Sequence, residues 1–392
     1  ISHRYRPYSP PRRRIRTISM RNTRANLWLA IVFTAVLLPL AATAQPKRPV
    51  TAATQFRSIT QWLMAFVLFT VLAGACKKTA EHPGDMGLTG DPTIDGLTEA
   101  IKTTPNDPNL YLKRSEIFYE REAYDQAIQD LAQVMKLDST NLKAHHLLAD
   151  VYMDSYQSAR ALQTMQRVVM LFPDSINTKL KLSEFQLILK QYDAALSTIA
   201  DIMEIRPGDP EALFMLGMIY RDQGKTDLAI GAFQSAVERN PDMSEAWVIL
   251  GDLMDRTHNP LASQYFDNAV RVAPNNVAAW HAKAYFLQNN DKIDEALEIY
   301  KHIHSLDAQY PEAYLNAGIL LMVKDSLDAA LREINILGEI DPANPAAWFY
   351  KGKIYHLKGQ NDEAKTAYEQ ALRLDPDYGQ AKDGLQELQS EK

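Results

Sequence analysis

The chain has 392 residues, 46% of them hydrophobic, and a formal net charge of −6. The stretch 1–76 contains eleven Lys and Arg and no acidic residue, so the remainder holds 31 basic and 48 acidic residues, a formal charge of −17. Because phosphate binding needs a basic face, this acidic main part argues against a nucleic-acid partner.

Residues 1–75 form a basic N-terminal stretch with two uncharged apolar runs, at 27–44 and 58–75. Each run follows arginine and ends in small residues, which is the order of a secretory signal. Cys76 directly follows the second run and is the only cysteine, so it cannot form an internal disulfide. This arrangement resembles the lipobox of bacterial lipoproteins.

The lipoprotein resemblance implies that Cys76 is lipidated and becomes the first residue of the mature protein. Lys77, the residue that follows, favours an outer-membrane location facing the periplasm over the inner membrane, by the same resemblance. The membrane is then reached through the N-terminal lipid, since two or three acyl chains anchor a protein stably.

Two other topologies remain open for the N-terminal stretch. In one, the second run stays uncleaved as an inner-membrane anchor, because about 18 apolar residues can span a bilayer. In the other, both runs form a transmembrane hairpin that leaves the main part in the cytoplasm as an adaptor. The hairpin would export Lys47, Arg48 and Arg57, against the positive-inside tendency.

Residues 76–92 are polar and glycine-containing, and they predict a flexible tether. Residues 93–107 place Leu97, Ala100 and Pro105 in the phase that the following repeat uses for its second helix. We therefore expect a half-repeat helix there.

Alanine recurs eight times from Ala127 onward with a 34-residue period, which is broken by a single 33-residue step. Such a period indicates a repeat architecture. A small residue precedes each alanine by eleven or twelve positions, and a large apolar residue follows four positions later. The alanines are Ala127, Ala161, Ala195, Ala229, Ala262, Ala296, Ala330 and Ala364.

Small residues let two helices approach closely, and the large residue fills the groove between them. Proline closes six of the units and cannot continue a helix, so each unit predicts a helical hairpin. The pattern resembles the tetratricopeptide repeat, best in the last unit with Trp348, Gly352, Tyr355, Ala364 and Tyr368. The resemblance implies an all-α, right-handed solenoid of eight hairpins over residues 108–378, with a capping helix at 379–392.

In this family the first helix of each hairpin lines a concave groove that holds a peptide or a helix of a partner. The inward positions that carry acids are Glu116, Asp150, Glu184 and Asp252, and the apolar ones are Phe214, Met218, Tyr285, Ile319, Met322 and Phe349. A partner segment with a basic end and an apolar end would be complementary. The alternative is that the acids only solvate the surface and the apolar residues pack between repeats.

No glycine-rich phosphate loop, nucleophile elbow or zinc-protease motif occurs, so the sequence predicts neither an enzyme nor a cofactor or metal site. His145 takes a position that other units fill with tryptophan, which favours packing over ligation. The sequence thus predicts a lipid-anchored scaffold of the bacterial envelope that binds proteins, for example in assembly or secretion. An enzyme with an unrecognised site in the groove is the remaining alternative.

Overall fold

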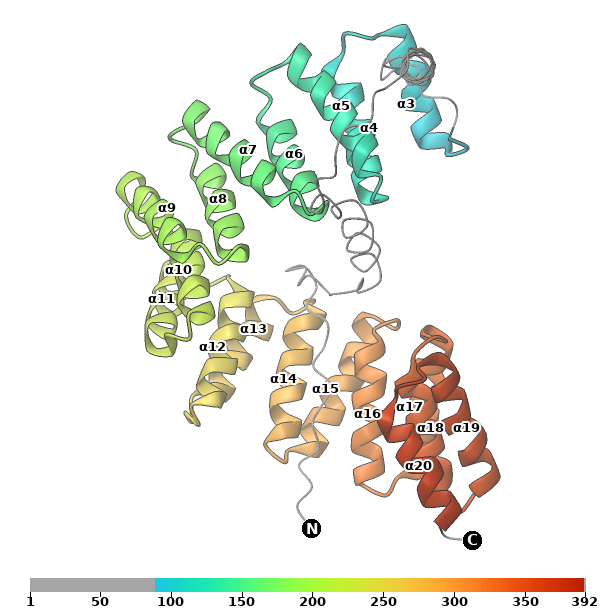
Figure 1. Cartoon of the computed structure of the whole chain (residues 1–392). Coiled ribbons are helices and arrows are strands. Elements are labelled where there is room, and N and C mark those ends of the chain that lie inside the picture. Colours follow the sequence, from blue (N-terminus) through green and yellow to red (C-terminus); the bar gives the residue numbers. More distant parts are fainter. Residues whose placement is uncertain (1–88, 391–392) are drawn as a thin grey trace, which may run out of the picture. The chain divides into compact units, whose positions relative to one another are not determined.

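The computed structural model describes residues 89–390, and every regular element in this range is an α-helix (Figure 1). The all-α repeat solenoid predicted from the sequence is confirmed. The helices are α3 Pro92–Thr103, α4 Pro108–Glu120, α5 Tyr124–Leu137, α6 Leu142–Asp154, α7 Ser158–Leu171, α8 Ile176–Ile188, α9 Tyr192–Ile205, α10 Pro210–Asp222, α11 Thr226–Arg239, α12 Ser244–Arg256, α13 Ala262–Val272, α14 Val277–Asn289, α15 Ile293–Leu306, α16 Pro311–Val323, α17 Leu327–Ile340, α18 Pro345–Leu357, α19 Asn361–Leu374 and α20 Gly379–Ser390.

The described helices pair into hairpins, from α4 with α5 to α18 with α19, and each hairpin packs against the next (Figure 1). Each predicted unit begins at or next to the first residue of its first helix, as at Pro108 and Pro345. First helices also contact one another, as α8 contacts α10 and α12 contacts α14. At the two ends of the array, α3 packs on α4 and α20 packs on both α18 and α19.

The repeated small residue is what allows the two helices of a hairpin to meet. A Cβ atom at Gly217 would lie 2.7 Å from the ring of Phe233, and one at Gly352 would lie 2.7 Å from the ring of Tyr368. Real Cβ atoms essentially never come this close to another heavy atom. The small-to-large pairing predicted from the period is therefore the contact that sets the distance between the helices.

The turn inside each hairpin has one residue with a positive φ. Six of these residues are not glycine, and the exposed Tyr156 has a φ of 62°. A left-handed residue just after a helix lets the chain reverse while the last carbonyls keep hydrogen bonds. The eight residues at this position are Glu122, Tyr156, Lys190, Gly224, His258, Asp291, Asp325 and Gly359.

At several junctions the turn before a hairpin is held by the fourth residue of its first helix. The indole nitrogen of Trp247 donates to the carbonyl of Pro241 at 2.7 Å, six residues earlier. His145 lies 2.9 Å through its Nε2 from the carbonyl of Ser139, also six residues earlier. His145 is buried and thus fills the structural place that tryptophan has elsewhere, as the sequence indicated.

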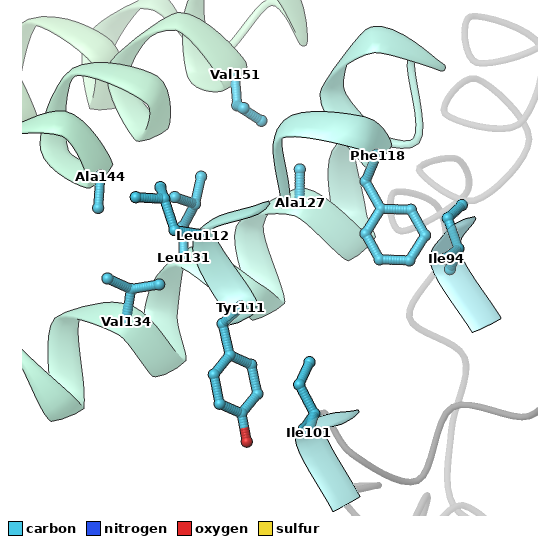
Figure 2. Close-up of a cluster of buried hydrophobic side chains, with 10 residues drawn as sticks. All are labelled: Ile94, Ile101, Tyr111, Leu112, Phe118, Ala127, Leu131, Val134, Ala144 and Val151. Carbon is cyan, nitrogen blue, oxygen red and sulfur yellow. The ribbon is translucent and has the colours of Figure 1, made fainter. Parts of the chain in front are cut away.

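The N-terminal helix α3 closes the apolar core of the first hairpin (Figure 2). Ile94 and Ile101 of α3 are buried beside Tyr111 and Phe118 of α4. Because an end repeat would otherwise leave an apolar face in water, α3 acts as a cap.

An ion pair lies inside this same cap. Arg114 is 0% exposed, and its guanidinium meets the carboxylate of Asp130 with Nε at 2.8 Å and Nη2 at 2.7 Å. Its Nη1 donates to the Thr98 hydroxyl of α3 at 2.9 Å. The arginine occupies a position that is leucine in the next two units, Leu148 and Leu182. It therefore joins three helices through polar contacts instead of apolar ones.

The apolar runs, Cys76 and most of the tether lie outside the described residues. Among the helices in the 89–390 range, none is both long and apolar enough to cross a membrane.

Candidate partner-binding surface

The predicted groove residues share one face of successive first helices, which we call the first-helix lining. Residues spaced 33 or 34 apart fall at equivalent places on α4, α6, α8, α10, α12, α14 and α16, and neighbouring first helices contact one another. The row consists of Glu116, Asp150, Glu184, Met218, Asp252, Tyr285 and Ile319, with Phe214, Met322 and Phe349 beside it.

Two acids of the lining are paired with lysines of the following first helix. Lys143 of α6 lies 2.5 Å from the Glu116 carboxylate, and Lys181 of α8 lies 2.7 Å from that of Asp150. Burial raises the pKa of Asp150, and the nearby Lys181 opposes that shift. These lysines neutralise part of the charge, so the N-terminal half of the lining is less negative than its acids alone indicate. The sequence analysis did not assign the two lysines to the lining.

The other two acids of the lining differ in their surroundings. Glu184 is exposed on α8. Asp252 forms an ion pair at 3.0 Å with Arg256, one turn further along the same helix. An exposed pair of this kind stabilises a helix by only a few tenths of a kcal/mol, roughly, and leaves both groups accessible to a partner.

Two apolar residues of the predicted lining belong to the core instead. Met218 is buried in α10. Phe349 is buried too, with ring centroids at 4.9 Å from Tyr350, 5.9 Å from Tyr368 and 5.5 Å from Tyr378. The expectation that Phe349 is open to a partner is corrected, because the capping helix α20 closes over the core that contains it.

Phe214 is intermediate between these buried residues and the accessible ones in its exposure to solvent. Its ring is half-buried and meets the ring of Phe233 edge-on, with centroids 5.5 Å apart. It therefore packs within its own hairpin and offers only part of its surface.

Accessible apolar surface gathers on the first helices near the C-terminus. Tyr285, Ile319 and Met322 are half-buried, while Val323 is 54% and Leu357 57% exposed. Val323 and Leu357 are the last residues of α16 and α18, and these helices are in contact. We call Ile319, Met322, Val323 and Leu357 the apolar strip. Sequence reasoning missed its two most exposed members, although their 34-residue spacing was visible.

Two histidines at the lining are held neutral. His146 of α6 lies 3.1 Å from the Thr178 hydroxyl, and desolvation together with Lys181 lowers its pKa to about 4. His281 of α14 is buried and lies 3.1 Å from Nδ2 of Asn316, and burial lowers its pKa to about 4.

Acid is expected to destabilise the array through His281. Its folded-state pKa of about 4 lies below the ordinary value of 6.5, so the folded state favours the neutral ring. The titration of His281 leaves the free energy of unfolding unchanged above pH 6.5. It lowers that free energy as the pH drops from 6.5 toward 4, because the unfolded chain takes up the proton first. By linkage the loss at pH 5 is about 2 kcal/mol.

The matched variant is His281→Gln, which keeps a hydrogen-bonding side chain and cannot titrate. Chemical denaturation at pH 7.5 and pH 5 should show a smaller loss for the variant than for the parent chain. Equal losses in the two proteins would show that this ring is not held neutral.

Among residues 89–390, no group of three or more His, Cys, Asp and Glu side chains is placed to hold a metal ion. The groups of the lining with a shifted pKa include a carboxylate that has a lysine partner and two neutral histidines on different helices. The arrangement offers charge pairing and apolar contact to a partner.

Family profiles described as tetratricopeptide repeat match residues 118–180, 214–256, 265–298, 290–354 and 345–378. Together they cover more than half of the chain. The chain therefore belongs to the tetratricopeptide repeat proteins. Repeats of this type imply a scaffold for protein–protein interaction.

Two curated relatives come from Dictyostelium discoideum. A TPR repeat-containing protein is 27% identical over 186 residues, which are 45% of this chain and 70% of the relative. A DnaJ homolog subfamily C member 7 homolog is 23% identical over 312 residues, which are 75% of this chain and 54% of the relative. The match thus spans about half the length of the second relative.

Two solved structures of bacterial proteins are similar to parts of this chain. The C-terminal part of a TPR repeat-containing protein from Cytophaga hutchinsonii has a TM-score of 0.49 and 20% identity, covering 60% of this chain and 98% of that one. The Pseudomonas aeruginosa protein pilF has a TM-score of 0.46 and 17% identity, covering 55% of this chain and 97% of that one.

Proposed function

We propose that this chain is a lipid-anchored scaffold of the bacterial envelope that holds a partner polypeptide on the C-terminal half of its first-helix lining. The apolar strip carries the proposal. Contiguous exposed apolar surface marks interaction sites, and Val323 and Leu357 expose more than half of their surface on adjacent helices. The paired acids of the N-terminal half contribute less, because lysines already neutralise part of their charge.

The envelope location rests on the sequence order of basic residues, apolar run and Cys76. In this proposal Cys76 is acylated and the tether separates the repeats from the membrane surface. Mass spectrometry of the N-terminal peptide tests the anchor. An acylated Cys76 is expected, whereas an unmodified and uncleaved residue 76 would favour the inner-membrane adaptor.

Partner retention tests the apolar strip. The double substitution Val323→Asp and Leu357→Asp places two charges in the strip without opening the core, since both side chains are largely exposed. Burying an unpaired charge against a partner is costly, so we expect at least about a tenfold loss of the crosslinked partner recovered from native membranes.

Met170→Asp is the matched control, because Met170 is 75% exposed on the second helix α7 and lies outside the lining. It should leave partner recovery unchanged. Equal recovery by the strip variant and the parent chain would exclude the strip as the binding surface.

A further inference from the structure

A cavity of about 660 Å³ lies at the C-terminal end of the first-helix lining. We call it the α18–α20 pocket. Helix α20 begins one repeat period after α18, so it takes the place of the first helix of a further unit. Ile319, Lys353 and Glu387 follow one another at the 34-residue spacing, in the same row of the lining. The pocket walls include Phe349 and Lys353 of α18, Tyr368 of α19, and Asp383, Gly384 and Glu387 of α20.

Tyr368 contributes its hydroxyl to this pocket. The residue is 2% exposed, and a Cβ at Gly384 would lie 2.7 Å from the ring carbon that bears the hydroxyl. The glycine thus leaves room for the polar end of the ring beneath α20.

The equivalent tyrosine two units earlier shows what this hydroxyl lacks. Tyr300 donates to Oε1 of Gln288 at 2.9 Å. Within residues 89–390, the Tyr368 hydroxyl makes no hydrogen bond. Because this hydroxyl lies on a cavity wall and has no partner among the described residues, a group that enters the cavity can form a hydrogen bond with it.

The charges beside Tyr368 define the chemistry of that group. Asp383 and Glu387 stand on the α20 wall, and in the described part of the chain neither carboxylate has an ion-pair partner. Burial and the charge of Glu387 raise the pKa of Tyr368 to about 12, so its hydroxyl remains protonated at neutral pH. On the α18 wall, Lys353 and His356 are engaged in other interactions.

Two carboxylates and a phenol oxygen suit a positively charged donor on an apolar stem. These oxygens accept hydrogen bonds from its N–H groups. Arginine and lysine side chains have this composition, and their stems match the apolar strip that ends beside the pocket at Leu357.

We propose that the α18–α20 pocket binds the guanidinium or ammonium group of an arginine or lysine side chain that the partner polypeptide presents. The proposal rests on the proposed scaffold function and adds the chemistry of one contact. The direction of the partner segment is then opposite to the one expected from the sequence. Its basic residue meets the C-terminal end of the array, beyond the apolar strip.

Fluorescence anisotropy with the full chain tests the pocket. The probes are three labelled, end-blocked peptides in which arginine, lysine or neutral citrulline stands among leucines. We expect the two cationic peptides to bind and the citrulline peptide to bind about tenfold more weakly, as loss of a charge-assisted hydrogen bond predicts.

The substitutions Glu387→Gln and Asp383→Asn should each weaken the binding of the cationic peptides by about the same factor. Tyr368→Phe keeps the packing and should weaken them less.

Glu369→Gln is the matched control for charge. Glu369 is exposed on α19, faces Lys365 at 3.9 Å and does not line the pocket, yet its substitution removes the same charge. It should leave affinity unchanged, and melting temperatures should show that every variant is folded.

Equal affinity for arginine and citrulline, equal weakening by Glu369→Gln and Glu387→Gln, or no binding at millimolar peptide would each overturn the pocket proposal. If the peptides fail to bind while the strip variant still loses its partner, the pocket is excluded and the scaffold function stands. If the strip variant keeps its partner, the scaffold proposal fails independently of the peptide result.

Discussion

Replacing Arg114 with leucine is expected to destabilise the N-terminal end of the array by about 3–5 kcal/mol, the usual cost of removing one partner from a buried ion pair. The substitution leaves the Asp130 carboxylate buried without its two hydrogen bonds and takes a donor from Thr98. Leucine itself fits, since it occupies the same position in the next two units. The loss should therefore come from the stranded carboxylate.

The double variant Arg114→Leu with Asp130→Ala separates charge from packing. Alanine stands at the position of Asp130 in two other units, as Ala232 and Ala367, so the pair would become apolar. A buried ion pair exchanged for apolar residues is often neutral. We expect the double variant to recover most of the lost stability.

Hydrogen exchange of α3, α4 and α5 is the measurement, because a repeat array unfolds locally and the ends open first. Lys102→Ala is the control, since Lys102 and Glu99 form an exposed pair on α3. It should change protection very little. If the single and double variants lose protection equally, the stranded charge does not explain the effect.

Gly217→Ala is expected to destabilise the fourth hairpin by about 1–3 kcal/mol, the range measured for overpacked cores. The new methyl would meet three ring carbons of Phe233 at 2.7, 2.8 and 2.9 Å. Phe233 is fully buried, so its ring cannot move away without disturbing the next hairpin. This loss would outweigh the gain of about 1 kcal/mol that alanine normally brings to a helix.

Gly231→Ala supplies the opposite result in the same hairpin. Gly231 lies inside α11, and a Cβ there would have no atom within 4 Å. The same change should therefore stabilise the protein by up to about 1 kcal/mol. Thermal denaturation should move the two melting temperatures in opposite directions. A shift of the same sign in both would mean that close approach at Gly217 is not what the repeat requires.

The candidate site was only partly predictable from the sequence. Spacing identified the face of each first helix, because residues one unit apart occupy equivalent places. Accessibility depends on neighbours that the spacing does not reveal. Phe349 shares its helix with exposed Leu357, yet α20 closes over Phe349 and leaves Leu357 open. The partner of Glu116 is Lys143, which belongs to the next unit.

The 34-residue period by itself determined the all-α hairpin solenoid, because small residues, large residues and prolines at fixed places specify close helix contact and helix ends over short distances of sequence. Only the tertiary structure decided which lining residues stay accessible, which acids are neutralised and where a cavity opens. Those properties arise at the contacts between one unit and the next. At the last of these contacts, α20 packs on α18 and α19 and places Glu387 in the same cavity lining as Tyr368.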